Sequence, residues 1–179
     1  IFSGYLDHYT GAMLFTEFLV KIRQTNPLCF SHFNFFITGE GPLKDTIKSH
    51  LNNLSKNIFL KFNLKKSEYL DLLKEIDIGL NLRDTNYLSA NVTFPTKVIE
   101  YTNNSILTIS TKSLGIRSIF NSKELILLKN LNTSSLEEVF VKIYKNPQII
   151  NKLKKNISND SFLCKNEVIK SKFIDFIKA

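Results

Sequence analysis

The hydrophobic and polar positions of this chain follow two periods, one typical of buried strands and one of amphipathic helices. Apolar runs predict strands at residues 1–6, 33–38, 58–62, 76–82, 105–110 and 124–128. Helical periodicity predicts helices at residues 12–24, 43–54, 67–74 and 95–102, and a further short element is expected at residues 113–120. A regular alternation of strand and helix is typical of a parallel sheet covered by helices on both faces. The pattern therefore predicts an α/β fold with a doubly wound parallel sheet.

The last part of the chain has a helical pattern only, from residue 134 to the end. Pro147 suits the first position of a helix, where no backbone N–H is needed. A second amphipathic stretch covers residues 162–177. We therefore expect one domain over residues 1–160 and a C-terminal helix over residues 161–179.

The composition is that of one globular domain, with 179 residues of which 43% are hydrophobic. The two cysteines, Cys29 and Cys164, lie far apart and have no partners at metal-ligand spacing, so we expect no disulfide, metal or cofactor. No apolar run would span a membrane and no signal-peptide pattern is present, so we expect a cytoplasmic protein. The only methionine is Met13, which indicates an excised domain or a processed fragment.

The net charge of +8 is compatible with nucleic acid, an anionic membrane surface or a phosphate-bearing substrate as partner. The lysines are spread along helical stretches, as at Lys152, Lys154 and Lys155, and we expect most of them to be solvated. A nucleic-acid-binding domain is a further reading, but no such motif or aromatic platform accompanies the charge, and we expect no nucleic acid partner. Peripheral contact with the inner face of a membrane stays an open alternative.

Glycine-containing turns follow the first two predicted strands, at the edge where doubly wound sheets bind ligands. Gly4 and Gly11 flank the first turn, where backbone amides could approach a phosphate, although an ordinary strand-to-helix turn explains them as well. Gly39 and Gly41 precede Pro42 in the second turn, which marks the start of a helix.

A third candidate segment is Pro-Thr-Lys-Val-Ile-Glu-Tyr at residues 95–101. Proline begins a predicted helix there, so Thr96, Lys97 and the free amides could meet a diphosphate. Glu100 lies about one turn further along, where its carboxylate could accept two hydrogen bonds from the cis-diol of a ribose. A surface carboxylate is the equally available alternative.

The order of these motifs resembles the C-terminal domain of the fourth glycosyltransferase family, retaining enzymes of the GT-B fold that take sugars from nucleoside diphosphates. The resemblance covers residues 4 to about 161; the family's G-x-G-P turn resembles residues 39–42, and its P-S-K-x-x-E-Y segment resembles residues 95–101. It implies a Rossmann-like domain whose C-terminal helix packs on an N-terminal domain that this chain lacks.

The resemblance also implies the site residues. The implied donor-nucleotide site consists of Gly4, Gly11, Gly39, Gly41, Phe62, Asn63, Leu64, Thr96, Lys97 and Glu100. In it, Glu100 binds the ribose hydroxyls, Thr96 and Lys97 contact the phosphates, and the backbone of residues 62–64 contacts the base. Arg83 and Asn91 are further candidate contacts to phosphate or sugar, with simple solvation as the alternative for Arg83. No residue is assigned as catalytic.

The function implied by the resemblance is that of a retaining, hexosyltransferase-type enzyme of bacterial surface polysaccharide biosynthesis, with a nucleotide sugar as donor and a glycan or lipid-linked acceptor. The fragment alone would be inactive, because the acceptor site and any general base lie on the N-terminal domain. The family often has arginine after the first glycine, lysine before the second and glutamate eight positions before Glu100, where this chain has Tyr5, Thr10 and Val92. A degenerate, non-catalytic binding module is therefore the alternative.

Overall fold

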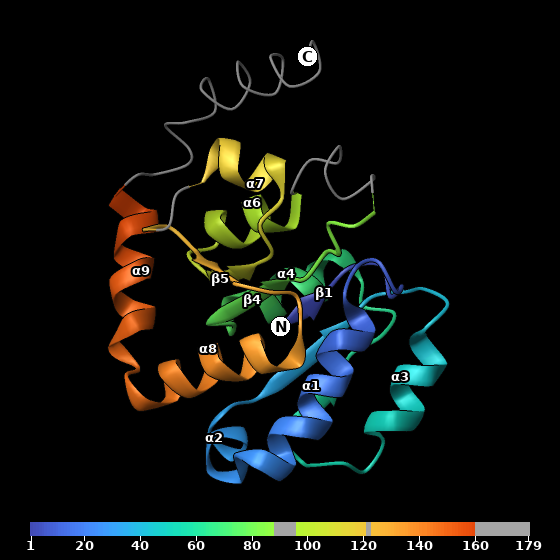
Figure 1. The fold of residues 1–179 in the computed structure, drawn as a ribbon. Helices are drawn as coiled ribbons and strands as arrows, with labels where there is room; N and C mark the ends of the chain where they lie inside the picture. Colours follow the sequence, from blue (N-terminus) through green and yellow to red (C-terminus); the bar gives the residue numbers. More distant parts are fainter. Residues whose placement is uncertain (88–95, 121–122, 160–179) are drawn as a thin grey trace.

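The chain follows the predicted alternation of strands and helices (Figure 1). The computed structural model describes residues 1–87, 96–120 and 123–159, with the backbone alone at 118–119 and 157–159. The strands are β1 (Phe2–Ser3), β2 (Phe35–Thr38), β3 (Ile58–Leu60), β4 (Ile78–Asn81), β5 (Leu107–Ser110) and β6 (Ile126–Leu127). The helices are α1 (Ala12–Thr25), α2 (Pro27–His32), α3 (Lys44–Leu51), α4 (Lys66–Lys74), α6 (Thr96–Asn103), α7 (Leu114–Ile119), α8 (Thr133–Lys145) and α9 (Gln148–Asn159). The C-terminal helix expected over 161–179 lies outside the described residues.

The strands form one sheet in the order β3-β2-β1-β4-β5-β6, and every strand pair in the described residues is parallel. The chain moves outward from β1 to β3 and then returns to place β4 beside β1. This arrangement confirms the predicted doubly wound sheet. The strand order reverses between β1 and β4, and such a reversal opens a crevice at the carboxyl ends of the strands.

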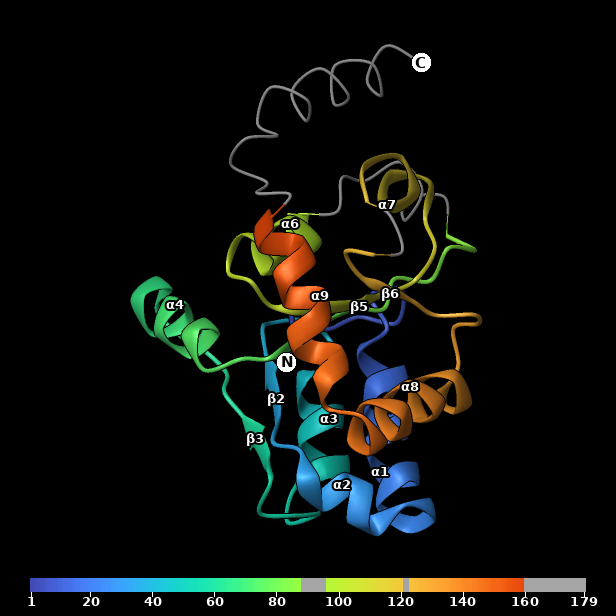
Figure 2. The same cartoon turned by 90° about the vertical axis from the view of Figure 1, so that its left-hand side faces the viewer.

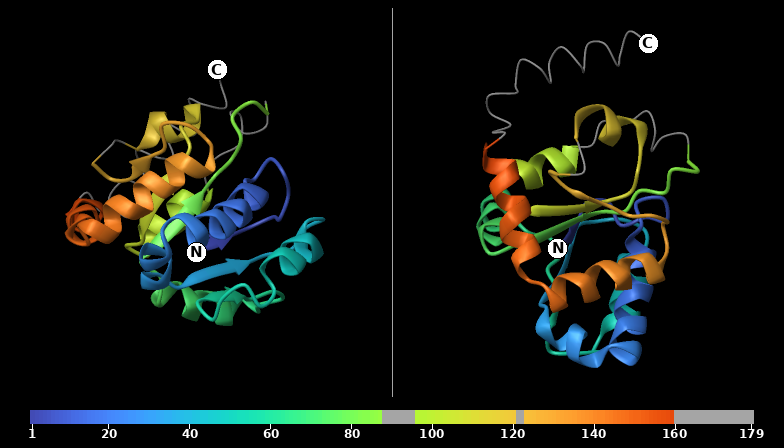
Figure 3. Two further views of the ribbon diagram at one scale, coloured as in Figure 1. Left: turned by 60° about the horizontal axis from the view of Figure 1, so that its bottom comes forward. Right: turned by 60° about the vertical axis from the view of Figure 1, so that its left-hand side comes forward.

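Helices cover both faces of the sheet. Figure 2 shows α1, α2, α3 and α8 on one side and α6 and α7 on the other. Helix α4 lies on the side of α6, because Leu73 of α4 and Tyr101 of α6 belong to one buried cluster. Figure 3 shows α8 and α9 meeting at a corner beside the sheet.

Phenylalanine side chains fill the core between the sheet and the layer of α1 and α8. Phe15 and Phe18 lie three residues apart on α1, so they share one face of the helix, and they meet Phe35 of β2. Phe140 of α8 joins them, with its ring centroid 5.0 Å from that of Phe18. Aromatic pairs of this kind contribute about 0.5–1.5 kcal/mol each beyond the burial of area. The cluster therefore attaches α8 to α1 although the two helices are distant in sequence.

Two local features differ from the sequence prediction. Residues 27–32 form helix α2, which was not expected, with Pro27 in its first turn and Cys29 and Phe30 buried. A helix of this length is too short for hydrophobic periodicity to reveal it. Strand β1 ends at Ser3 and not at residue 6, because Gly4 adopts a φ of 142° that turns the chain away from the sheet.

Candidate functional site

A cavity of about 290 Å³ lies at the carboxyl ends of β1 and β2, beside the reversal of strand order. We call it the switch-point cavity. Its lining residues are Ser3, Gly4, Thr38, Gly39, Glu40, Asn63, Leu64, Tyr69 and Lys97. The sequence prediction had placed a ligand site at this edge of the sheet, and the cavity joins residues from four of the loops and helices expected there.

The glycines of the two turns differ in their surroundings. A Cβ at Gly39 would overlap the carbonyl group of Gly4, one at Gly41 would overlap the backbone of the loop after β1, and one at Gly11 would overlap the end of β4. These three glycines permit close contact between backbone segments. At Gly4 a Cβ would meet nothing within 4 Å, so the backbone of Gly4 faces open space in the cavity.

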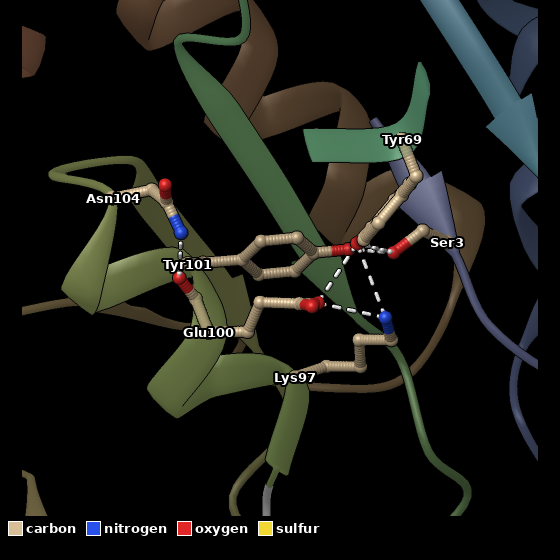
Figure 4. Close-up of polar contacts among 6 residues, drawn as sticks. All are labelled: Ser3, Tyr69, Lys97, Glu100, Tyr101 and Asn104. Carbon is tan, nitrogen blue, oxygen red and sulfur yellow. Dashed lines mark hydrogen bonds and ion pairs between the residues drawn. The ribbon is translucent and has the colours of Figure 1, made fainter. Parts of the chain in front are cut away.

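Three side chains on one side of the cavity form a closed polar network (Figure 4). The Tyr69 hydroxyl donates to Glu100 Oε2 at 2.8 Å. Lys97 Nζ donates to the same carboxylate oxygen at 2.7 Å and to the Tyr69 hydroxyl at 3.1 Å. Lys97 Nζ also lies 4.7 Å from the centroid of the Tyr69 ring, within the range of a cation–π interaction. Glu100 Oε1 accepts no hydrogen bond from any residue that the structure describes.

The network is anchored in the sheet by Ser3 and Tyr101. Ser3 Oγ lies 2.9 Å from the Tyr69 hydroxyl and 2.8 Å from the Tyr101 hydroxyl. Because the single proton of Tyr69 goes to Glu100, Ser3 donates to Tyr69 and Tyr101 in turn donates to Ser3. Tyr101 reaches this position by lying against β4 at Gly79, where a Cβ would overlap its ring. One chain of hydrogen bonds thus connects the buried face of α6 to the carboxylate of Glu100.

Burial raises the pKa of Tyr69 above its usual range, and the adjacent carboxylate of Glu100 adds to the shift. Burial likewise raises the pKa of Tyr101. Both phenols therefore keep their protons at all physiological pH values. Tyr69 is a permanent hydrogen-bond donor to Glu100, and the carboxylate is held in one orientation.

Helix α6 supplies the cationic and acidic groups of the site. Its first turn carries Thr96, which is exposed, and Lys97, whose side chain is 33% exposed. The free backbone amides of a first helical turn and the helix dipole favour an anion. Glu100 lies one turn later with its side chain 31% exposed, so a ligand in the cavity can reach both charged groups.

The turn after β3 also lines the cavity, through Asn63 and Leu64. Asn63 has a left-handed backbone with φ 57°, and its Oδ1 accepts from Lys44 Nζ at 3.3 Å. Lys44 Nζ also pairs with Glu40 at 2.9 Å and lies 5.2 Å from the centroid of the Phe62 ring. Asn63 and Leu64 line the cavity, whereas Phe62 packs against the core.

The structure thus brings together a large part of the site implied by the sequence. Of those residues, Gly4, Gly39, Asn63, Leu64 and Lys97 line the cavity, and Glu100 joins through its contacts with Lys97 and Tyr69. The remaining four, Gly11, Gly41, Phe62 and Thr96, are not among the lining residues. Asn91, Val92 and Pro95 lie outside the described residues.

Arg83 follows β4 at the same edge of the sheet, as expected, and interacts with other residues of the chain. Sequence reasoning missed Ser3, Tyr69 and Tyr101. Ser3 could have been found, since it is the polar residue that ends the first predicted strand. Nothing in the pattern indicated Tyr69, because only the packing of α4 on β1 and α6 brings it to the cavity.

Among the described residues, no cluster of three or more histidine, cysteine, aspartate and glutamate side chains has the arrangement of a metal site. The cavity offers the ammonium group of Lys97 and the exposed backbone of Gly4, and beside it lies the carboxylate of Glu100, one oxygen of which accepts no hydrogen bond from the described residues. The carboxylate of Glu40 also lines the cavity, but it is paired with Lys44. These groups suit a ligand that carries both negative charge and hydroxyl groups.

Three solved structures show what this fold is similar to. One is the C-terminal domain of LpcC from Francisella tularensis, a glycosyl transferase group 1 family protein. It has a TM-score of 0.69 and a sequence identity of 15%, and the match covers 96% of this chain and 84% of the LpcC domain. TarM of S. aureus has a TM-score of 0.73 and 17% identity over 100% of this chain and 34% of its own. HepE of Anabaena, solved with UDP, has a TM-score of 0.71 and 11% identity over 97% of this chain and 48% of its own.

At these identities the likeness establishes the Rossmann-like fold of a GT-B C-terminal domain. The chain spans about a third of TarM (34%) and about half of HepE (48%). No curated protein matches the sequence. A sequence model of the family described as "Glycosyl transferases group 1" matches residues 1–160, so the chain belongs to this glycosyltransferase family.

Proposed function

We propose that this chain binds a nucleoside-diphosphate sugar in the switch-point cavity and is the donor half of a retaining, hexosyltransferase-type enzyme. The observation that carries the proposal is the pairing of Lys97, in the first turn of α6, with Glu100 one turn later, beside a cavity that the open backbone of Gly4 also lines. A diphosphate needs the ammonium group of Lys97 and the helix amides, and a ribose needs the carboxylate of Glu100. The family membership supports the same reading.

Each group has a defined role in this proposal. Glu100 Oε1, which accepts no hydrogen bond from the described residues, receives the ribose hydroxyls, while Oε2 stays bonded to Tyr69 and Lys97. Lys97, Thr96 and the amides of α6 face the diphosphate. The base lies against the turn at Asn63 and the residues beside it, Phe62 and Leu64. UDP is the first nucleotide to test, because HepE was solved with UDP and with UDP-glucose.

The chemistry assigned to this half is stabilisation of the leaving group. As the bond between sugar and diphosphate breaks, negative charge grows on the diphosphate, where Lys97 and the helix amides of α6 stabilise it. Gly4, with no Cβ, lets backbone amides approach the phosphates, and Gly11, Gly39 and Gly41 keep the surrounding turns close together. Arg83 and Asn91 are proposed as further contacts to phosphate or sugar.

The acceptor, a glycan or a lipid-linked sugar of bacterial surface polysaccharide, is proposed to bind an N-terminal domain, on which the helix at 161–179 packs. This chain alone therefore transfers little or no sugar. We further propose a cytoplasmic location with peripheral contact at the inner face of the membrane and no nucleic acid partner. None of the described helices is long and apolar enough to cross a membrane.

A degenerate, non-catalytic module is the second candidate, and particular side chains favour it. Tyr5, at a position where the family often has arginine, is 55% exposed. Thr10, at a position where it often has lysine, is tied to the backbone of Asp7, donating to its carbonyl at 2.8 Å. The two expected phosphate charges are therefore absent from this loop, and Lys97 is the remaining lining lysine of the cavity.

The test is a calorimetric titration with UDP, GDP, ADP and their sugar conjugates. Binding of one diphosphate, lost in Glu100→Ala and kept in Glu17→Ala, supports the donor site and identifies its base. Glu17 is an exposed glutamate of α1 outside the cavity, so it controls for the change of charge. If the folded protein binds none of the diphosphates, the degenerate module is the better description.

A further inference from the structure

We propose that a second cavity, along the edge strand β6, binds a lipid with an anionic head group. This cavity, the basic groove, has a volume of about 790 Å³ and lies between β6, α8 and α9. Helices α8 and α9, which both line the groove, meet at a corner beside the sheet (Figure 3). It shares no lining residue with the switch-point cavity, so this inference does not depend on the proposed donor site.

The floor of the basic groove is apolar. It includes Ile126 and Leu127 of β6, Val139 and Ile143 of α8, and Leu153 of α9. Ile143 is buried, whereas the other four are half-buried. In the described residues β6 is the outermost strand, so no further strand covers these side chains. Their remaining exposed surface is what an acyl chain would remove from water.

Lysines surround this floor. Lys112, Lys129, Lys142 and Lys152 are all exposed, and within the described ranges none of their ammonium groups has a hydrogen bond or ion pair with another residue. Glu138 is the one carboxylate among the lining residues. Positive charges that have no ion-pair partner among the described residues, placed around an apolar surface, favour a ligand that is both anionic and apolar.

Other occupants fit the groove less well. No lining residue is aromatic, so a single-stranded nucleic acid would find no stacking surface. β6 has 2 residues, which offers too short an edge for an added peptide strand. An acidic helix of about 10 Å diameter would place only about two turns in this volume. A volume of about 300–1,000 Å³ is typical of sites for one small ligand, such as a single lipid.

The experiment is a titration of the protein with monomeric dihexanoyl-phosphatidylglycerol, alongside its shorter dibutyroyl form, dihexanoyl-phosphatidylcholine and inorganic phosphate. We expect saturable binding of the first, weaker binding of the shorter chain, and none of the zwitterionic lipid or of phosphate at the same concentrations. In the double variant Lys129→Gln/Lys142→Gln, affinity should fall by at least about tenfold, since each lysine near an anionic lipid contributes about fivefold.

The matched control is Lys48→Gln/Lys56→Gln, which removes the same charge from two exposed lysines outside the groove. Its lipid affinity should stay within about twofold of the unchanged protein. Equal weakening by the two double variants, or equal affinity for both chain lengths, would overturn the proposal, because the attraction would then be one of overall charge. Absence of lipid binding overturns it as well. UDP binding should be unchanged in the groove variant, which separates this site from the donor site.

Discussion

Replacing Tyr69 with phenylalanine removes one hydroxyl group and leaves the ring in place. The ring still lies beneath Lys97 Nζ, so the cation–π contact at 4.7 Å is kept. The lost group is the donor that bonds Glu100 Oε2 at 2.8 Å and the acceptor that Ser3 reaches at 2.9 Å. The substitution therefore tests whether Tyr69 positions the carboxylate for a ribose.

The expected loss of UDP affinity in Tyr69→Phe follows from the geometry of Glu100. A hydrogen bond to a charged group contributes about 1.5–3 kcal/mol when it is well shielded from water. The Glu100 side chain is 31% exposed and Lys97 still bonds the same oxygen, so we expect the loss of binding free energy to fall below this range. A loss of about 1 kcal/mol corresponds to about fivefold weaker binding of UDP. Ser3 can turn its proton toward Tyr101, so the loss of stability should be small.

The assay compares UDP with its deoxyribose form in the unchanged protein and in Tyr69→Phe. The unchanged protein should prefer UDP, and the variant should lose most of that preference while binding the deoxyribose form equally well. Tyr101→Phe is the matched control, because its hydroxyl contacts Ser3 and not Glu100. If Tyr69→Phe keeps the full preference while Glu100→Ala loses it, the positioning role of Tyr69 is refuted.

Three further predictions concern stability and UDP binding. Glu137 accepts hydrogen bonds from Thr25 and Lys21. Burial alone would raise the pKa of Glu137, but these hydrogen bonds lower it overall. The carboxylate therefore stabilises the fold at pH values above the unfolded pKa near 4.5, and this stabilisation is lost as the pH falls through the lower pKa of the folded state. Glu137→Gln should cost about 1–2 kcal/mol at neutral pH in urea unfolding, and the difference from the unchanged protein should disappear at pH values well below 4.5. Gly39→Ala should unfold the protein at markedly lower temperature, because its Cβ would overlap Gly4. Gly4→Ala should also lower the unfolding temperature, because a φ of 142° disfavours a side chain, and it should weaken UDP binding, since its Cβ enters the open cavity. A Gly4→Ala variant that binds UDP normally would contradict the placement of the phosphates.

The fold could be predicted from the sequence more fully than the site. Apolar runs and helical periodicity were sufficient for the sheet, because a strand buried on both faces must be apolar throughout. They were insufficient for α2 at residues 27–32, which is shorter than two helical turns. Glu100 and Lys97 were identified through a motif, and their pairing was not foreseen, because it depends on the distance between two flexible side chains.

The sequence by itself determined the order of elements, the parallel sheet and therefore the edge at which we propose that a ligand binds, since local periodicity and turn residues depend on neighbouring positions. Only the tertiary structure decided which oxygen of Glu100 has no hydrogen-bond donor among the described residues. That outcome requires Tyr69 from α4, Ser3 from β1 and Tyr101 from α6 to meet in one network. The basic groove has the same origin, because its lysines and apolar residues come from separate elements and become one surface only when α8 and α9 fold against β6.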